Sequence, residues 1–299
     1  MKQNKIGAIV VLYKPDINAI KVNLQLLAQQ VEILLVVDNS SENNIRFIPT
    51  CENITYIPLM HNVGIAAAQN EGIRNLTKYD LDYVLFSDQD STPESDTAEK
   101  LLLAFRLIKN LGIKVAATGT TSINVTTGNP YPPKTPEGEY FRLNGYDNVM
   151  HAKQCDAIPS SISLLELEVI KEIGGFDESL FIDGVDYEWC WRAAMKGYHV
   201  YCVKEAPIKH MLGEGDHVLH GRHIAISSPF RCYYQYRNYL WLLNRDYVPT
   251  WWKRKHLFKY MVKFFYYPLF SKPHLPYITN MLKGISDGIL KTNIPNFEL

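Results

Sequence analysis

Apolar, often β-branched runs alternate with segments of helical periodicity through the first 120 residues. The apolar runs predict buried strands over residues 6–13, 33–37, 54–58, 83–87 and 115–119. Apolar residues that recur every three or four positions predict helices over residues 17–27, 65–76 and 94–111. This order predicts an α/β fold whose mostly parallel sheet is covered by helices on both faces.

Polar segments follow three of the predicted strands, at residues 38–41, 61–64 and 88–91. In open parallel sheets, ligands bind beyond the carboxyl ends of the strands. We therefore expect the functional site where these segments meet.

The pattern becomes less regular after this point. Residues 120–149 are rich in Thr, Gly, Pro and Asn and predict a long excursion from the sheet. A helix is expected over residues 183–196 and a strand over residues 199–203. Aromatic and basic residues dominate from Tyr233 onward.

The composition adds a charge asymmetry to this picture. The 299-residue chain is 46% hydrophobic and 21% charged, which excludes collagen-like and mostly disordered proteins. Its 31 Lys and Arg balance its 31 Asp and Glu, so the net charge gives no indication of nucleic-acid binding. Residues 247–299 nevertheless hold eight basic and two acidic side chains, and the preceding residues carry the opposite excess. The C-terminal segment is therefore chemically distinct.

The five cysteines are widely spaced and include no C-x-x-C pair, which argues against a disulfide framework and a zinc knuckle. This pattern indicates a reducing, cytoplasmic compartment. Residues 6–13 follow two lysines as in a signal peptide, but the run is short and lacks a convincing cleavage site. We interpret it as the first strand. No run approaches the roughly 18 apolar residues of a membrane span.

Asp88 and Asp90 follow the fourth predicted strand with one residue between them. Two such carboxylates can share Mg²⁺ or Mn²⁺, because these ions prefer oxygen ligands and leave places for water and phosphate. The alternative is a pair of solvated turn carboxylates that cap the residues after them. His210 follows a strand, and it fits a structural histidine or, if it meets Asp90, a metal ligand.

Asp183, Asp186 and Glu188 lie at the expected start of a helix, where the helix dipole favours carboxylates. One interpretation is N-terminal capping. The other is a general base, since an Asp beside aromatic neighbours can have its proton affinity tuned to deprotonate a hydroxyl. Trp189 in the same segment fits either a core residue or an aromatic wall against a sugar ring.

Several motifs occur in a fixed order, at residues 8–13, 36–41, 62–72, 88–90 and 174–178 and at Asp186. Together they resemble the family 2 glycosyltransferases, which have the Rossmann-like GT-A fold. Further matches make the chain most similar to bacterial rhamnosyltransferases, at residues 88–91, 185–192, 231–234 and 237–240. The resemblance covers about residues 5–245.

The resemblance implies roles for individual residues. Tyr13 and Asp38 would line the nucleobase pocket of a nucleotide-sugar donor, and Asp88 would lie near the ribose. Asp90 would bind the Mg²⁺ or Mn²⁺ that bridges the diphosphate, with His210 as a further metal contact. The remaining donor contacts would be Asn62 and Gln69.

Asp186 matches the catalytic base, which would deprotonate an acceptor hydroxyl for a single displacement that inverts the anomeric centre. Contacts to the acceptor or the donor sugar would come from Asp183, Glu188, Trp189, Arg231, Arg237 and Asn238. Many members of the family have an acid where this chain has Val185 and an arginine where it has Gln69. These departures leave open the choice between Asp186 and Asp183 as the base and the identity of the diphosphate contacts.

The resemblance implies a glycosyltransferase that moves a sugar, with dTDP-L-rhamnose as donor, onto a glycan or lipid-linked oligosaccharide in bacterial cell-surface polysaccharide (O-antigen) synthesis. Its domain would span residues 1–245, with a nucleotide-binding half over 1–120 and an acceptor-binding half over 121–245. The Q-x-x-R-W signature of processive synthases is absent from the sequence, so we expect one sugar per encounter.

Two other functions fit parts of the sequence. A haloacid-dehalogenase-like phosphatase would use Asp88 as its nucleophile, but its motif normally follows the first strand, and here three strands precede it. A non-catalytic sugar-binding protein is the other alternative.

Residues 246–299 would form a helical extension rich in lysines and aromatic residues. This composition is typical of an interfacial helix on an anionic membrane, which would place the protein peripherally on the cytoplasmic face of the inner membrane. A helix packed on the body is the alternative, and nucleic acid is disfavoured by the acidic body.

Overall fold

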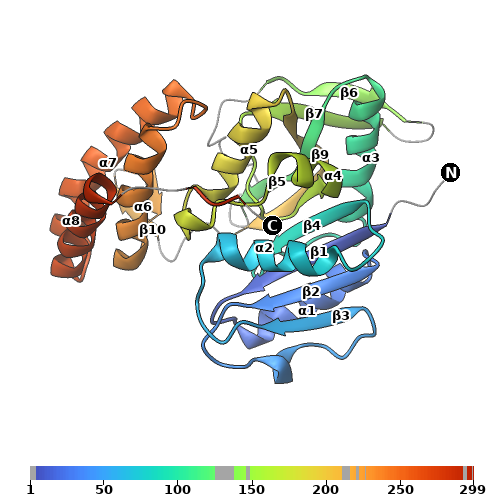
Figure 1. The fold of residues 1–299 in the computed structure, drawn as a ribbon, viewed down its shortest axis with the longest axis horizontal. Coiled ribbons are helices and arrows are strands. Elements are labelled where there is room, and N and C mark those ends of the chain that lie inside the picture. The colour runs from blue at the N-terminus through green and yellow to red at the C-terminus, as the bar shows by residue number, and fades with distance from the viewer. Residues whose placement is uncertain are drawn as a thin grey trace.

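The computed structural model describes residues 5–124, 138–145, 149–210, 216–219, 222–225, 227–291, 295–297 and 299. Its central layer is a nine-stranded sheet in the order β3-β2-β1-β4-β8-β5-β9-β7-β6 (Figure 1). The first half of the chain alternates strands and helices, with the bounds β1 Ile6–Leu12, α1 Ile17–Ala28, β2 Ile33–Asp38, β3 Ile54–Pro58, α2 Ile65–Leu76, β4 Tyr83–Asp88 and α3 Thr97–Asn110. A short 3₁₀ helix, Ile45–Phe47, precedes β3.

The predicted α/β fold is confirmed. Strands β1 to β4 are parallel, and β1 lies between β2 and β4. Because side chains alternate along a strand, Ile9 and Val11 pack on one face with α2, whereas Ala8 and Val10 pack on the other with α1 and α3. Burial on both faces is the reason that these strands read as continuous apolar runs.

The second half of the chain adds antiparallel strands to the sheet. Its elements are β5 Val115–Asn124, β6 Phe141–Asn144, β7 Val149–Cys155, β8 Ser163–Glu166, α4 Leu167–Ile173, α5 Val185–Met195 and β9 His199–His210. The four-residue β8 lies antiparallel between β4 and β5. The sequence predicts a long excursion over residues 120–149. Residues 120–124 instead continue β5, residues 141–144 form β6, and residue 149 begins β7. Residues 125–137 and 146–148 lie outside the described residues.

Three helices stand beside the α/β body: α6 Pro229–Leu243, α7 Thr250–Phe270 and α8 His274–Leu290 (Figure 1). They share a small aromatic core that contains Tyr236, Tyr267 and Met281. The hairpin β10 Asp216–Leu219 and β11 Arg222–Ala225 precedes them. This arrangement confirms the predicted helical extension. Within the described residues, none of the helices combines the length and the apolar character that crossing a bilayer requires.

A buried charge network connects the helical part to the body. Arg245, which follows α6, lies 2.5 Å from Asp177 and 3.4 Å from Glu188. Glu188 also pairs with Arg192 at 2.7 Å and accepts a hydrogen bond from the Tyr247 hydroxyl at 2.6 Å. Since unpaired charges are costly to bury, these mutual contacts fix α5 against the segment between α6 and α7.

Candidate active site

The carboxyl ends of three neighbouring strands bring the predicted donor residues to one edge of the sheet. Leu12 at the end of β1 is in register with Asp38 at the end of β2, and Val11 is in register with Asp88 at the end of β4. Tyr13 follows directly on β1, and its side chain is 42% exposed. The structure therefore places Tyr13, Asp38 and Asp88 side by side, as the parallel topology requires.

Asp38 is completely buried at this edge. Its carboxylate accepts hydrogen bonds from the Tyr56 hydroxyl at 2.6 Å, the Asn44 amide at 2.8 Å and the Ser40 backbone N–H at 3.0 Å. Burial alone would raise the pKa of Asp38, but these three hydrogen bonds outweigh it and hold the pKa below its usual value. Asp38 is therefore a fixed, ionised acceptor of hydrogen bonds.

The turn after β4 is held in place by residues from other elements. The side-chain amide of Gln89 forms two hydrogen bonds with the backbone of Tyr13, at 2.9 and 3.2 Å. The backbone carbonyl of Gln89 accepts a third from the Asn23 side chain of α1 at 3.1 Å. The hydroxyls of Ser91 and Ser161 are 2.6 Å apart. These contacts orient Asp88 and Asp90 on either side of Gln89. Neither Asn23 nor Ser161 belongs to a recognisable motif, so no sequence pattern predicts their contacts with this turn.

Carboxylates from distant parts of the chain converge beside this turn. Burial, followed by the negative charges of Asp186 and Asp90, raises the pKa of Asp88 to about 7. A hydrogen bond with Ser161 and the positive charge of Arg231 act in the opposite direction. The fold has thus brought the first turn of α5 close to the end of β4, although almost one hundred residues separate them.

The loop before α5 has an unusual backbone. Phe181 and Asp183 both have φ of 65°, and Gly184 has φ of 94°. Left-handed residues other than glycine are strained and persist where the surrounding structure imposes them. In this loop Asp183 forms a two-pronged ion pair with Arg231 of α6, with its shorter contact at 2.6 Å.

Arg237 and Asn238 of α6 impose the loop conformation. The Asn238 amide donates to the carbonyls of residues 180, 182 and 183 at 2.7–3.0 Å. The Arg237 guanidinium donates to the carbonyls of residues 179 and 180 and lies 4.1 Å from the Trp241 ring. The resemblance implies that both contact the acceptor or the donor sugar. In the structure their polar groups bind the backbone of the loop that carries Asp183.

The amino-terminal end of α2 closes the other side of this loop. Asn62 accepts hydrogen bonds from Asn39 at 2.9 Å and from the Gly64 N–H at 3.0 Å. The next N–H, that of Ile65, donates to the Phe181 carbonyl at 2.7 Å. Asn62 is therefore at the site edge, where it fixes the turn between β3 and α2.

Gly64 permits the close approach between α2 and this loop. Its φ is 89°, and an added Cβ would lie 2.7 Å from the Phe181 carbonyl oxygen. Gly64 also has ψ of 161°, a backbone conformation that residues other than glycine rarely adopt. We expect Gly64→Ala to lower the free energy of unfolding by more than the roughly 1–3 kcal/mol that such a strained backbone costs by itself. Gly112→Ala is the control for positive φ alone, because Gly112 has φ of 79° with open space at its Cβ. Equal losses for the two variants in urea denaturation would contradict this packing.

Three other predicted contacts lie in the interior. Gln69 donates to the Ser160 hydroxyl at 3.0 Å, and its Oε1 is buried without a hydrogen-bond partner among the described residues. Trp189 is buried and donates to the Gly174 carbonyl at 2.9 Å. Glu188 is buried in the charge network described above, where burial is the leading cause of its raised pKa. In this structure neither Glu188 nor Trp189 presents an exposed surface to a sugar.

Of the three residues proposed as ligands of a metal ion, the structure describes the side chains of Asp88 and Asp90. Asp88 and Asp90 supply hard oxygen ligands of the kind that Mg²⁺ and Mn²⁺ prefer. The side chain of His210, at the end of β9, lies outside the described residues. In the part of the chain that the structure describes, no group of three His, Cys, Asp or Glu side chains is close enough to bind a metal ion. The two Asp residues fit a cation that takes its other ligands from water and phosphate.

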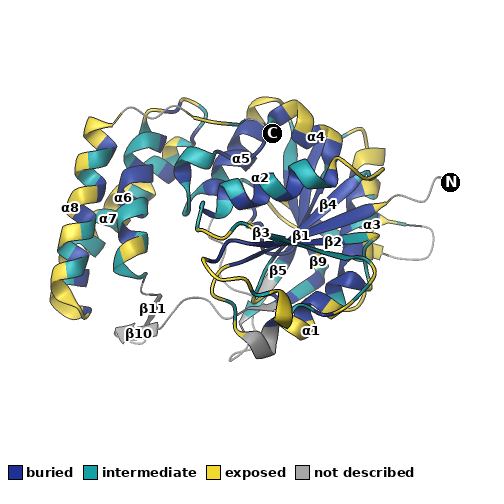
Figure 2. Cartoon of the chain, turned by 60° about the horizontal axis from the view of Figure 1, so that its bottom comes forward, coloured by how far each residue is buried: buried dark blue, intermediate teal, exposed yellow. Residues whose placement is uncertain are grey.

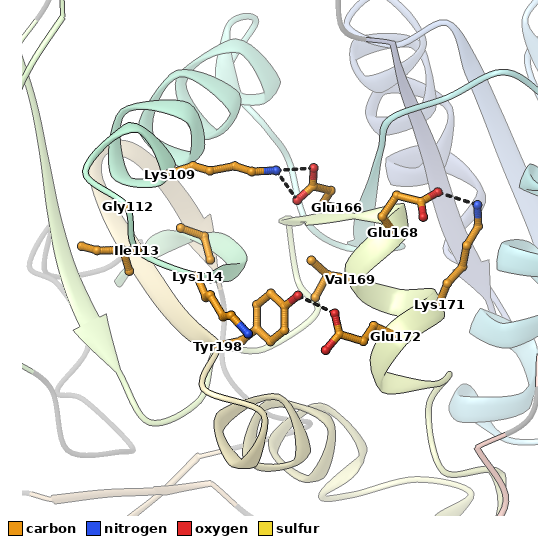
Figure 3. A pocket seen from close by; sticks show the side chains of 11 residues that line it. Lys109, Gly112, Ile113, Lys114, Glu166, Glu168, Val169, Lys171, Glu172 and Tyr198 are labelled. Atoms are coloured by element: carbon orange, nitrogen blue, oxygen red, sulfur yellow. Dashed lines mark hydrogen bonds and ion pairs between the residues drawn. The ribbon is translucent and has the colours of Figure 1, made fainter.

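A separate depression of about 850 Å³ lies at the opposite edge of the sheet (Figure 3). Glu166, in its wall, is paired with Tyr83 at the start of β4, whereas Asp88 is at the end of that strand. Lys109 and Glu166 form an ion pair across it at 2.6 Å. This depression is distinct from the carboxylate site, because it lies at the other edge of the sheet and charged residues in its wall form ion pairs with one another.

A buried Asp after β2, an Asp pair after β4 and an Asp facing them from a helix define a site of the nucleotide-sugar transferase class on a GT-A fold. The comparisons with known proteins agree. Residues 9–170 match the family model described as glycosyl transferase family 2. The chain is 30% identical over 253 residues to the dTDP-rhamnosyl transferase RfbF of Shigella flexneri, with 82% of each chain covered. This chain belongs to glycosyl transferase family 2.

Further relatives extend the comparison. The low-salt glycan biosynthesis hexosyltransferase Agl10 of Haloferax volcanii is 27% identical over 201 residues, which cover 65% of this chain and 63% of Agl10. The structure of S. aureus TarS 1–349 in complex with UDP-GlcNAc has a TM-score of 0.55 at 17% identity, with 95% of this chain and 80% of TarS 1–349 covered. The chain is therefore a hexosyltransferase related to rhamnosyltransferases, which favours the first of the three functions considered from sequence.

Proposed function

We propose that the enzyme is an inverting, metal-dependent rhamnosyltransferase. Its donor is dTDP-L-rhamnose, and its acceptor is a glycan or lipid-linked oligosaccharide of bacterial cell-surface polysaccharide (O-antigen) synthesis, reached at the cytoplasmic face of the membrane. The observation that carries the proposal is the convergence of Asp88, Asp90 and Asp186 beyond the parallel strands. Similarity to RfbF supports the choice of sugar.

The donor nucleotide would bind along the ends of β1, β2 and β4. Asp38 is completely buried and its carboxylate already accepts hydrogen bonds from Tyr56, Asn44 and Ser40, so it would shape the nucleobase pocket by fixing these neighbours rather than by contacting the base. The exposed ring of Tyr13 offers a surface for stacking on that base. Asp88, held at the end of the next strand, is placed for the ribose.

Asp90 and Asp88 would hold Mg²⁺ or Mn²⁺ against the diphosphate, with His210 as a further candidate ligand. The ion supplies positive charge that stabilises the departing nucleoside diphosphate. Arg231 is a second source of positive charge near Asp88, contributed by the chain itself.

Asp186 would act as the base. Its carboxylate takes the proton of the acceptor hydroxyl, the oxygen of that hydroxyl bonds to the anomeric carbon, and the bond from that carbon to the diphosphate oxygen breaks. One such displacement inverts the anomeric centre. Asp183, three residues earlier, is bound to Arg231 in a two-pronged ion pair, and we propose that its role is to hold the loop before α5.

Thermal unfolding with nucleoside diphosphates and Mn²⁺ tests the donor assignment. At a concentration of one hundred times Kd, a ligand stabilises the native state by about 2.7 kcal/mol. For a chain of 299 residues, this should raise Tm by roughly 4 °C. We expect dTDP to have a larger effect than UDP at equal concentration, and inorganic phosphate to have none. Stabilisation by phosphate but by neither nucleotide would contradict the proposal.

A further inference from the structure

The outer side of α7 is apolar although it faces solvent. Leu257, Met261, Phe265 and Leu269 recur at every fourth position, and each is at least half exposed. Phe258, which is 70% exposed, and Val262 widen this stripe. We call these six residues the α7 stripe. Exposed apolar stripes of this size on a helix normally mark an interaction site.

The stripe is not the packing side of the helix. Trp252 and Tyr267 of α7 are buried against the rest of the protein, and Tyr260 accepts a hydrogen bond from the Tyr236 hydroxyl of α6 through its carbonyl at 2.7 Å. In helical projection these residues lie opposite the α7 stripe. The helix is thus apolar on two sides, of which its intramolecular contacts use one.

A second apolar stripe lies on α8. Leu275, Leu282 and Ile289 are spaced by seven residues, so they lie on one side of the helix, and each is at least half exposed. Figure 2 shows exposed positions on α7 and α8 in the helical part that stands away from the sheet. Apolar exposure is therefore a property of this part of the protein rather than of one helix.

The charge of this region restricts what can cover it. Residues 247–286 hold seven Lys and Arg and no acid. Lys255 and Lys259 are exposed and lie along one side of the α7 stripe in helical projection, and the exposed Arg254 lies in line with the stripe, one turn before Leu257. A second copy of the chain packed on the same face would bring these basic side chains together across a two-fold axis. An anionic lipid surface binds both the apolar stripe, through its hydrocarbon interior, and the basic side chains near the stripe, through its headgroups.

We infer that the α7 stripe lies in the interface of an anionic lipid bilayer. The helix would lie along the surface with its apolar side chains below the headgroups and the basic side chains at headgroup level. The helix does not need to cross the bilayer, which agrees with the absence of a sufficiently apolar helix among the described residues.

The contacts at the start of α7 connect this surface to the site. The Trp251 indole donates to the Asp156 carboxylate at 2.6 Å, and the Tyr239 hydroxyl donates to the Lys253 carbonyl at 2.9 Å. Asp156 lies a few residues before Ser161, which contacts Ser91 of the carboxylate turn. A bilayer bound to α7 would therefore fix the orientation of the site toward the membrane. The benefit of that orientation rests on the proposed lipid-linked acceptor, whereas the binding itself does not.

Vesicle flotation of the full-length protein tests the inference. The probes are phosphatidylcholine vesicles with and without phosphatidylglycerol, at low and high salt. We expect flotation with the anionic vesicles that decreases, but persists in part, at high salt, because the apolar contribution is not screened. Phe258→Ser combined with Phe265→Ser should reduce the bound fraction at least tenfold, since two large aromatic side chains are removed from the interface.

The matched control is Leu111→Ser combined with Met195→Ser. These residues are 62% and 66% exposed on the α/β body, and their loss should leave flotation unchanged. Circular dichroism and transfer to a soluble acceptor are measured for each variant, so that failure of binding is distinguished from failure of folding or of the proposed function. Absence of flotation at low salt would overturn the inference. So would a dimer in light scattering that the Phe258→Ser and Phe265→Ser pair dissociates, because the stripe would then be an interface between two copies.

Discussion

Asp186→Asn is expected to lower kcat by about 10²- to 10⁴-fold, the range that a general base contributes. An amide cannot accept the proton of the acceptor hydroxyl, whereas the donor nucleotide does not depend on that step. The affinity for dTDP should therefore change little. Initial rates at saturating donor and acceptor, together with calorimetric titration of dTDP, measure the two quantities separately.

Asp183→Asn is the internal control for this result. Asp183 has the same chemistry, lies three residues before Asp186 in the loop that precedes α5, and forms an ion pair with Arg231. We expect this variant to weaken the ion pair and to retain most of the turnover. If Asp183→Asn abolished transfer and Asp186→Asn did not, the base would have been assigned three residues too late.

The first half of the fold could be predicted because its strands are buried on both faces. A strand such as β1 is apolar at successive positions, and the intervening helices have one clear apolar side. The carboxyl ends of parallel strands then lie at one edge, so that Asp38 and Asp88 could be placed together from order alone. Topology of this kind is encoded locally.

The missed parts of the fold have no such local pattern. Strand β8 has four residues and continues directly into α4, so its sequence lacks both the length and the turn residues that mark a strand. It joins β4 to β5 through antiparallel pairing. Its place in the sheet depends on contacts between residues that are roughly 45 and 80 positions apart along the chain.

In the candidate site, too, some residues could be predicted from the sequence and others could not. The residues that carry negative charge could be proposed from motifs, but the residues that orient them could not. Tyr56 and Asn44 fix Asp38, and Asn23 fixes the turn after β4, through hydrogen bonds that exist after folding. A motif also does not distinguish a sugar contact from a scaffold. Arg237 lies in a motif typical of the family, and its guanidinium binds the loop backbone.

Removal of divalent cations is expected to abolish transfer and to be reversible. A cluster of carboxyl groups that contains Asp88, Asp90 and Asp186 repels the diphosphate of a donor unless positive charge offsets it, and the nearby Arg231 is itself paired with Asp183. Excess EDTA should therefore eliminate turnover, and added Mn²⁺ or Mg²⁺ should restore it.

Asp90→Ala should have a similar effect without damage to the fold, because this side chain is exposed. We expect turnover to fall by at least about 10²-fold, in line with the loss of a charge-stabilising group from a transition state. Mn²⁺ should then no longer add to the thermal stabilisation by dTDP. Glu168→Ala removes an exposed acid from the first turn of α4, in the wall of the depression at the opposite edge of the sheet, and should leave both measurements unchanged. Full turnover in EDTA would instead mean that Arg231 and other groups of the chain neutralise the departing diphosphate, and that Asp88 and Asp90 serve the ribose and the turn.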